Sequence, residues 1–443
     1  MARLGRLRIP DRLTQGWRAR LRAQRRWWRR QWRSDDDIQV LFPTVGHGVV
    51  AVGTLAGGPE ARGPRIAILH ATAGSGHKRA AQALAAALTR LQPAALVREV
   101  DTLVFASRFY RNTYAASYNA MAARAPALWG ALYHSWSIAR VNRSTAPVRL
   151  AMDRLNLRRL VRVLERESPD AVVCTHFLPV EALSPIRGHG RLRVPLYCVI
   201  TDFAAHPFWA FPHVDRYFVA SPEVAAELAG HGVDAARIEV TGIPVDPAFG
   251  RSVGRAAARQ RLGLDVDEPM VLVMGGGSGV GPLAELAERL AALAQRPRVM
   301  VVCGTNQRLR REVESRPAAR AGRVRALGFS HEVDLLLEGC DVVVSKAGGL
   351  TCSEALIKQA PLVVFKPTPG QEERNADFLE RGGAAVHADS IAEVEAMVSR
   401  WLAEPETRER VRAAAAKLAH PDAAERIARR VLESLPQALM RSA

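Results

Sequence analysis

The chain has 443 residues, 48% of them hydrophobic, so it is long enough for two or three domains and apolar enough to bury large cores. These values exclude an intrinsically disordered protein. The formal net charge is +18, but residues 1–33 hold 12 arginines and one acid, so most of the excess charge lies in that arm.

The five cysteines occur singly, without the C-x-x-C spacing of zinc or redox sites. They lie mostly in apolar runs, which predicts buried, reduced thiols and a cytoplasmic protein. The arginine-rich start is not followed by an apolar core with a small-residue cleavage site, so we expect no signal peptide.

The N-terminal arm, residues 1–37, carries apolar side chains at helical spacing between its arginines. They are Leu13, Trp17, Leu21, Trp28 and Trp32. This pattern is typical of a helix that lies on an anionic membrane surface. The alternative is a basic arm that binds nucleic acid or nothing in particular. The uncharged residues 38–59 could span a bilayer by length, but Pro43 and several glycines favour a hairpin or loop.

From residue 65 onward strand patterns alternate with helical patterns, as in parallel α/β sheets. Strands are expected at residues 65–70, 171–175, 196–201, 216–220 and 238–241, and then, after a restart near Pro247, at 271–274, 299–303, 341–345 and 362–365. The sequence therefore predicts two doubly wound, Rossmann-like domains, residues 38–246 and 247–443, with the final helices able to pack back on the first. Ligands of such sheets bind at the carboxyl ends of the strands.

The loop after the first strand reads HATAGSGHKRAAQAL. A strand that runs through a glycine turn into a helix N-terminus resembles a phosphate-binding loop. It is not a Walker A motif, because His77 separates Gly76 from Lys78. A tight turn with an incidental histidine is the alternative.

A second glycine turn, MVLVMGGGSGVGP, begins at residue 270. Gly279, Gly281 and Ala284 fit the weak G-x-G-x-x-A form of the dinucleotide-binding motif. The next strand, however, leads into Gly304-Thr305-Asn306 and not into the acid that a dinucleotide ribose requires, which disfavours a nicotinamide or flavin cofactor.

A third loop follows the strand at 341–345, and there we expect a helix to begin at Thr351 with its dipole directed at a diphosphate. Glu354, one turn in, could accept hydrogen bonds from both hydroxyls of a ribose, although acids are also common in first helical turns. The polar loop at residues 367–372 suits sugar hydroxyls.

These motifs together resemble glycosyltransferase family 28, in the branch of monogalactosyldiacylglycerol synthases and bacterial diacylglycerol glucosyltransferases. The resemblance covers roughly residues 65–400 and rests on GSGH at 74–77, TDF at 201–203, HP at 206–207, YFV at 217–219, TGIPV at 241–245, GGG at 275–277, CGTN at 303–306, LGF at 327–329, residues 345–354 and PGQE at 369–372. It departs from the branch where Ala73 and Ser75 interrupt the glycine run. It implies a GT-B fold, a UDP-sugar in the C-terminal domain, an acceptor in the N-terminal domain and transfer with inversion.

Candidate site residues follow from the motifs and the resemblance together. His77 is the first candidate for the catalytic base and Asp202 the second, either as base or as the group that orients His77. Donor-binding candidates are Gly276, Gly277, Ser278, Asn306, Gly328, Phe329, Lys346, Gly348, Gly349, Leu350, Thr351, Glu354, Gln371 and Glu372. Candidates for the acceptor or membrane side are Gly74, Ser75, Gly76, Phe109, Tyr110, Trp129, Trp136 and His206, although a buried helical hairpin would use the same aromatic rings.

The resemblance implies an inverting hexosyltransferase that uses a UDP-sugar and a membrane lipid, in the first place diacylglycerol. The alternative is a UDP-GlcNAc-type transferase acting on a lipid-linked cell-wall precursor; a sugar-nucleotide-binding protein without turnover, or a nucleic-acid binder, is a different class. We expect no cofactor, no metal and no nucleic-acid partner. The metal motif Asp265-Val266-Asp267 precedes its strand, so we expect a surface loop there. The enzyme is expected at the cytoplasmic face of the membrane as a peripheral protein; the donor sugar and the oligomeric state stay open.

Overall fold

A computed structural model describes residues 63–72, 74–111, 113, 150–277 and 279–436, together with strands β1 (Leu41–Pro43) and β2 (Val50–Val52). The basic arm, Trp129, Trp136 and Ser278 lie outside the described residues. β1 and β2 pair antiparallel, within the stretch where a hairpin or loop was predicted. In the part of the chain that the structure covers, no helix has both the length and the apolar character needed to cross a membrane.

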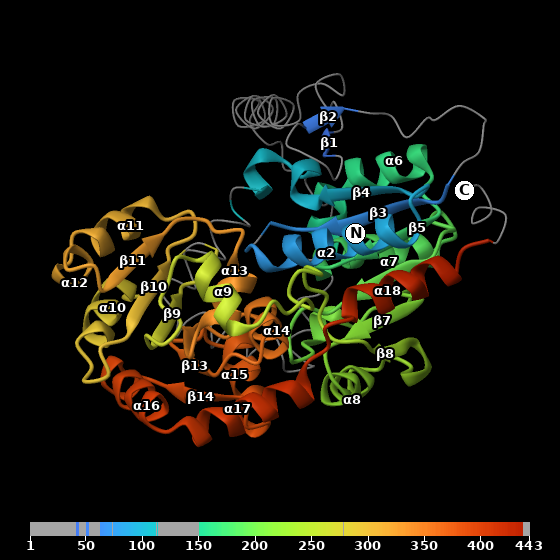
Figure 1. Ribbon diagram of the computed structural model, residues 1–443. Coiled ribbons are helices and arrows are strands. Elements are labelled where there is room, and N and C mark those ends of the chain that lie inside the picture. Colours follow the sequence, from blue (N-terminus) through green and yellow to red (C-terminus); the bar gives the residue numbers. More distant parts are fainter. Residues whose placement is uncertain are drawn as a thin grey trace, which may run out of the picture.

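The first sheet, as far as it is described, has six parallel strands in the order β4-β3-β5-β6-β7-β8 (Figure 1). The strands are β3 (Arg65–His70), β4 (Leu96–Asp101), β5 (Ala171–Cys174), β6 (Leu196–Val199), β7 (Arg216–Val219) and β8 (Ile238–Val240). The main helices are α2 (Gly76–Leu91), α6 (Arg158–Glu167), α7 (Phe177–Gly188) and α8 (Pro222–Gly230).

The second described sheet is also parallel and six-stranded, in the order β11-β10-β9-β12-β13-β14. Its strands are β9 (Met270–Met274), β10 (Arg298–Val302), β11 (Val324–Leu327), β12 (Val342–Ser345), β13 (Leu362–Phe365) and β14 (Ala385–Ala388). Its helices are α9 (Arg255–Arg261), α10 (Leu283–Ala291), α11 (Gln307–Glu314), α12 (Pro317–Arg320), α13 (Val333–Gly339), α14 (Gly349–Ile357), α15 (Gln371–Arg381), α16 (Ile391–Ala403) and α17 (Pro405–Leu418). The chain is thus α/β with two Rossmann-like sheets, as predicted.

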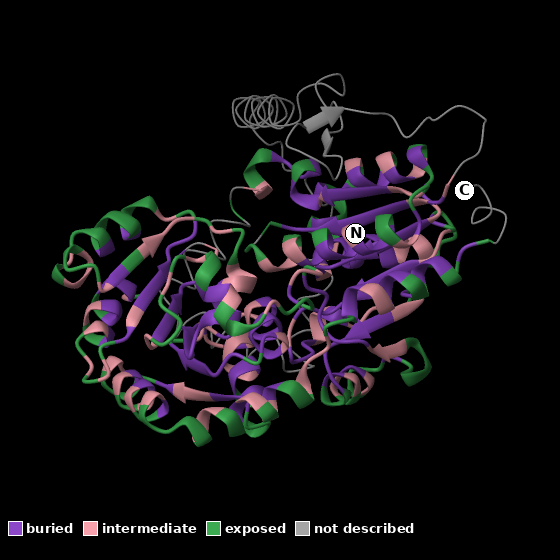
Figure 2. Cartoon of the chain, viewed as in Figure 1, coloured by how far each residue is buried: buried purple, intermediate pink, exposed green. Residues whose placement is uncertain are grey.

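The last described helix, α18 (Ala423–Glu433), returns to the first sheet and packs along α2 (Figure 1). Ile427 and Val431 share one hydrophobic cluster with Ile66 of β3 and Leu84 of α2. Each such fully buried side chain stabilises the fold by about 1.5–3 kcal/mol. Burial is concentrated in both sheets and in the inner faces of the helices (Figure 2).

Each sheet has a switch point, where the direction of strand addition reverses. In the first sheet it lies between β3 and β5, and in the second between β9 and β12. Ligands of doubly wound sheets bind at the carboxyl ends of such neighbouring strands. The two glycine loops and the β12–α14 loop all leave these strands, so the topology brings the predicted motifs to the two switch points.

Candidate active site

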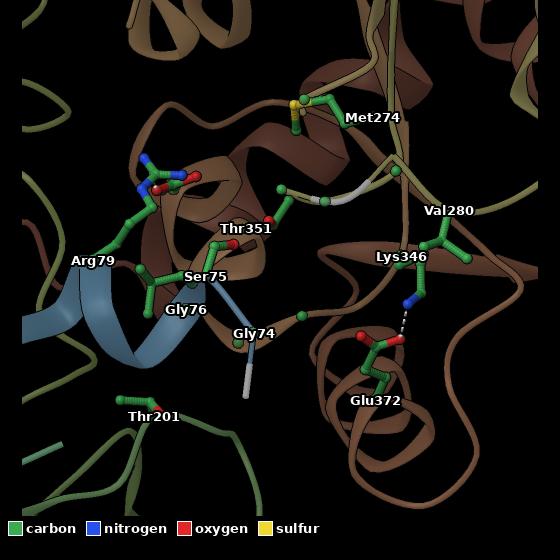
Figure 3. Close-up of a pocket in the computed structure, with 18 of the residues that line it drawn as sticks. Gly74, Ser75, Gly76, Arg79, Thr201, Met274, Val280, Lys346, Thr351 and Glu372 are labelled. Atoms are coloured by element: carbon green, nitrogen blue, oxygen red, sulfur yellow. Dashed lines mark ion pairs between the residues drawn. The ribbon is translucent and has the colours of Figure 1, made fainter. Parts of the chain in front are cut away.

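The two switch points face each other across one cleft of about 490 Å³. From the first domain the cleft is lined by Gly74, Ser75, Gly76, His77, Arg79, Thr201 and Asp202. The second domain contributes Met274, Gly275, Gly276, Gly277, Val280, Val302, Gly304, Phe329, Ser330, Val333, Lys346, Gly348, Gly349, Leu350, Thr351, Glu354, Thr368, Gln371 and Glu372. Figure 3 shows the start of α2 opposite the glycine turn after β9, with Thr351 and Lys346 on the second-domain side.

His77 is the second residue of α2 and is half-buried. Its Nδ1 lies 2.8 Å from the carbonyl oxygen of Thr175 and 2.8 Å from Oγ1 of Thr201. A carbonyl oxygen can only accept, so Nδ1 carries the proton and donates it, and Nε2 keeps the lone pair. The hydroxyl of Thr175 donates to the His77 carbonyl (2.9 Å), so β5 and α2 hold each other across the switch point.

Burial lowers the pKa of His77 to about 4, although the hydrogen bond to Thr175 opposes this effect. The imidazole is therefore neutral at pH 7, and Nε2 can accept a proton. His176 meets His77 edge-on, with ring centroids 4.5 Å apart, and burial also holds the pKa of His176 well below its usual value.

Asp202 follows β6, and the buried Asn375 of α15 holds it in place. Asn375 Nδ2 donates to Asp202 Oδ1 (3.1 Å) and to the Ala347 carbonyl (2.9 Å), while its Oδ1 accepts from the Phe203 amide (2.7 Å). One side chain thereby joins loops of both domains. Burial raises the pKa of Asp202 to about 6, partly opposed by the bond from Asn375, so the carboxyl is mostly ionised at pH 7.

The N-terminus of α14 opens into the cleft without a capping side chain, because its N-cap is Gly348. A Cβ on Gly349 would lie 2.0 Å from the Thr201 carbonyl oxygen, so glycine is required for this approach of the two domains. The first amides of a helix lack intrahelical acceptors and form the positive end of its dipole, which suits an anion. The helix begins two residues before the predicted Thr351, so Glu354 lies in its second turn and not its first.

The glycine turn after β9 also needs its glycines. Gly276 has φ +69°, and a Cβ on Gly277 would lie 2.6 Å from Ser75 Oγ in the opposite loop. At Gly304, which has φ +58°, a Cβ would lie 2.3 Å from the carbonyl oxygen of Gly277. These close approaches bring the loops after β3, β9 and β10 into contact.

Glu354 is only 1% exposed, and its partner comes from the other domain. Arg79 Nη2 lies 2.6 Å from Glu354 Oε1, in an ion pair whose angles are not those of a hydrogen bond. Burial raises the pKa of Glu354 to about 7, and the charge of Arg79 opposes that rise.

On the other side of α14, Lys346 Nζ pairs with Glu372 Oε2 at 3.2 Å (Figure 3). The same oxygen accepts from the amide of Thr368 (2.5 Å). Gln371 begins α15 and lines the cleft. Phe329 also lines it and is 58% exposed.

Several predicted site residues lie elsewhere. Asn306 caps α11 and donates to the Gly279 carbonyl (3.0 Å), and neither Asn306 nor Gly328 lines the cleft. His206 is buried and caps the 3-10 turn Pro207–Trp209, because its Nδ1 accepts from the Phe208 amide. Tyr110 is partly buried, hydrogen-bonds to Asp153 and does not line the cleft.

Three residues that shape the site were not predicted as site residues. Arg79 and Thr201 line the cleft, whereas the buried Asn375 does not line it but holds Asp202 in place. Arg79 stands inside an alanine-rich helix, Thr201 was noted only as part of the TDF motif, and Asn375 is one polar residue in a charged helix. Asp265 and Asp267 lie on an exposed turn before β9, as expected for a surface loop.

Two family models match the chain in order. Residues 77–245 match the model of monogalactosyldiacylglycerol (MGDG) synthase, and residues 270–427 match the glycosyltransferase family 28 C-terminal domain. A processive diacylglycerol beta-glucosyltransferase of Bacillus thuringiensis (strain Al Hakam) is 31% identical over 277 residues, which are 62% of this chain and 71% of that relative. The chain belongs to glycosyltransferase family 28.

A second protein with the same name and two solved structures are also similar to this chain. The enzyme of the same name from Bacillus mycoides (strain KBAB4) is 33% identical over 246 residues, 55% of this chain. The match covers 63% of that relative's length. Among solved structures, MurG of Acinetobacter baumannii has a TM-score of 0.55 at 15% identity, and the match covers 84% of this chain and 99% of that one. The glycotransferase of kitacinnamycin also has a TM-score of 0.55, at 16% identity, and the match covers 85% of this chain and all of that one (100%). These two likenesses establish the GT-B fold.

Proposed function

We propose that this member of family 28 transfers a hexose, with inversion, from a UDP-sugar to a hydroxyl of a membrane lipid, in the first place diacylglycerol. The observation that carries the proposal is a neutral His77 in the first domain facing an uncapped helix N-terminus in the second, across one cleft. The names of the similar Bacillus proteins, processive diacylglycerol beta-glucosyltransferases, support diacylglycerol as acceptor and glucose as sugar.

In the proposed reaction His77 Nε2 takes the proton of the acceptor hydroxyl as that oxygen attacks the anomeric carbon. The bond from the anomeric carbon to the phosphate oxygen breaks, and UDP leaves with the electron pair. The amides at Gly348 to Thr351 and the turn at Gly276 and Gly277 would stabilise the charge of the departing diphosphate, so we propose that no metal is needed. A single displacement of this kind inverts the anomeric centre.

The second domain, residues 247–443, would hold the donor, with Glu354 on the ribose hydroxyls and Gln371 and Glu372 near the sugar. The first, residues 38–246, would hold the acceptor beside Gly74, Ser75 and Gly76. We also propose that the boundary between the two domains lies at Pro247.

We further propose that the enzyme works as a peripheral protein on the cytoplasmic face of an anionic membrane. The first domain exposes four large apolar side chains on two segments, Val104 and Phe109 on one and Met152 and Leu155 on the other, each at least 45% exposed. A hydrogen bond from Ser107 Oγ to Asn156 Oδ1 (2.9 Å) fixes their two segments side by side. Exposed Arg154 and Arg162 lie on the same helical stretch, and apolar side chains among arginines suit a lipid headgroup surface.

The test is incubation with UDP-glucose, UDP-galactose or UDP-GlcNAc and vesicles that contain diacylglycerol, followed by mass analysis of the lipids. The proposal requires a glycosylated diacylglycerol with at least one donor, and loss of that product in His77→Ala. Transfer of N-acetylglucosamine to a lipid-linked cell-wall precursor, with none to diacylglycerol, would overturn the proposed acceptor.

A further inference from the structure

Arg79 contacts the carboxylate that we assign to the donor from the opposite wall of the cleft. It stands on the first turn of α2, two residues after His77, and reaches Glu354 on α14 (Figure 3 labels Arg79). The Arg79 side chain is 36% exposed, whereas that of Glu354 is 2% exposed. An ion pair between an arginine of one domain and a buried acid of the other contributes little to stability, because ordering the arginine side chain and desolvating the acid both cost free energy. This points to another role for Arg79.

We propose that Arg79 is a positioning residue for the donor, which keeps the Glu354 carboxylate charged and in place to receive the ribose hydroxyls of the UDP-sugar. This inference rests on the proposed role of Glu354 in the proposed function. It adds a residue of the first domain to a subsite otherwise built from the second.

The geometry leaves the carboxylate able to bind both partners. An ionised carboxylate offers about four acceptor positions, and one guanidinium group does not fill them. Glu354 Oε1 is buried and has no hydrogen bond in the described structure, although Arg79 Nη2 lies 2.6 Å away. Glu354 also lines the cleft, so a ribose hydroxyl can bond to its second oxygen, Oε2, while Arg79 remains beside Oε1.

The charges around Glu354 explain why it needs a cation. Burial is the largest cause that raises the pKa of Glu354 to about 7, and the carboxylates of Asp246, after β8, and Asp334, on α13, raise it further. Arg79 acts in the opposite direction. On α15, which also packs against α14, Glu372 is paired with Lys346. With Arg79 present the acid is about half ionised at pH 7; without Arg79 its pKa would be higher still, so it would be mostly protonated at neutral pH and would accept hydrogen bonds poorly.

The experiment measures UDP affinity by calorimetry between pH 6 and 9 for the full chain and for Arg79→Met, Arg79→Lys and Glu354→Gln. In the wild type the affinity should rise with pH through a midpoint near 7, where the carboxylate forms. In Arg79→Met the midpoint should move up by at least about one pH unit, so affinity at pH 7 falls about fivefold and recovers at pH 9. Arg79→Lys should restore the wild-type midpoint.

Arg90→Met is the matched control. Arg90 lies on the same helix and pairs with Glu425 of α18 at 2.5 Å, away from the cleft. Loss of Arg90 should leave the midpoint of UDP affinity against pH unchanged. The melting temperature of each variant shows whether it remains folded. A role of Arg79 limited to holding the domains together would lower UDP affinity equally at every pH, and that result, or an unmoved midpoint, overturns the inference.

Glu354→Gln separates this inference from the proposed function. If Glu354 hydrogen-bonds to the ribose hydroxyls, Glu354→Gln should bind UDP at least about fivefold more weakly. Its UDP affinity should also lose the pH dependence that the carboxyl causes. Unchanged UDP affinity in Glu354→Gln would contradict the proposed contact between Glu354 and the ribose. A weakened Glu354→Gln together with an unmoved Arg79→Met midpoint would remove only the role of Arg79.

Discussion

At the scale of single residues, the cleft holds our two candidates for the catalytic base, His77 and Asp202. Burial acts on them in opposite directions, lowering the pKa of His77 to about 4 and raising that of Asp202 to about 6. His77 has the better defined geometry, because Thr175 determines which ring nitrogen carries the proton. Asp202 is held by Asn375, as expected of a group that orients other residues or substrates.

Replacement of the base should reduce turnover without affecting donor binding. His77→Ala should keep UDP affinity and lower kcat by about 10²–10⁴, the span usual for a general base. Steady-state kinetics and calorimetry on the same samples measure both quantities. If Asp202→Asn causes the loss and His77→Ala remains active, the two roles must be exchanged.

The pH profile of kcat at saturating donor gives an independent test of the base. A base works only when deprotonated, so kcat should fall as the pH drops through the pKa of that base in the bound enzyme. With His77 as base, kcat should remain nearly level down to about pH 5, because the pKa of His77 is about 4. A fall in kcat centred near pH 6 would match the pKa of Asp202 and contradict our assignment.

At the scale of elements, the fit between α14 and the loop after β6 brings the two domains together. In Gly349→Ala the added Cβ would lie 2.0 Å from the Thr201 carbonyl oxygen, so α14 and the Asp202 loop must separate. Overpacking of this kind costs about 1–3 kcal/mol, and we expect a lower melting temperature together with lower kcat.

Gly230→Ala serves as the control for this substitution. Gly230 ends α8, and a Cβ there would meet no atom within 4 Å. Its melting temperature and activity should equal those of the wild type within error. A Gly349→Ala variant with wild-type behaviour would mean that the domains do not need this contact.

The central strands were predictable from the sequence, and most edge strands were not. β3, β5, β9 and β13 lie in the interior of their sheets, and each was recognised from a continuous apolar run. Strands β4, β11 and β14 lie at sheet edges and were missed. An edge strand is less enclosed than a central one, so polar residues interrupt its apolar pattern. β4, which reads LVREVD, and β14, which reads AVHA, are examples.

At the scale of the whole molecule, the basic arm is predicted to hold the enzyme on the membrane. Residues 1–33 carry 12 arginines, each contributing about 1 kcal/mol near an anionic surface in a salt-dependent manner. Their removal should abolish much of the binding to anionic vesicles and slow transfer to lipid in a bilayer. UDP affinity should not change, because the donor candidates lie in the second domain.

Cosedimentation of full-length and truncated protein with anionic vesicles, at low and high salt, tests the role of the arm. Equal sedimentation of both forms would contradict it. Retention of DNA or RNA that depends on the arm, with vesicle binding unchanged on truncation, would favour a nucleic-acid arm instead.

The sequence alone determined the α/β class, the succession of two domains, the glycine loops and the family, since these depend on local patterns and on motif order. It also located His77, Glu354 and Asp202, because each follows a recognisable strand or loop. Only the tertiary structure decided that Arg79 meets Glu354, that Asn375 joins Asp202 to Ala347, and that Asn306 and His206, which cap their own helices locally, lie outside the cleft. Contacts between residues some 170 to 280 positions apart depend on how two sheets face each other, and no local periodicity encodes that arrangement.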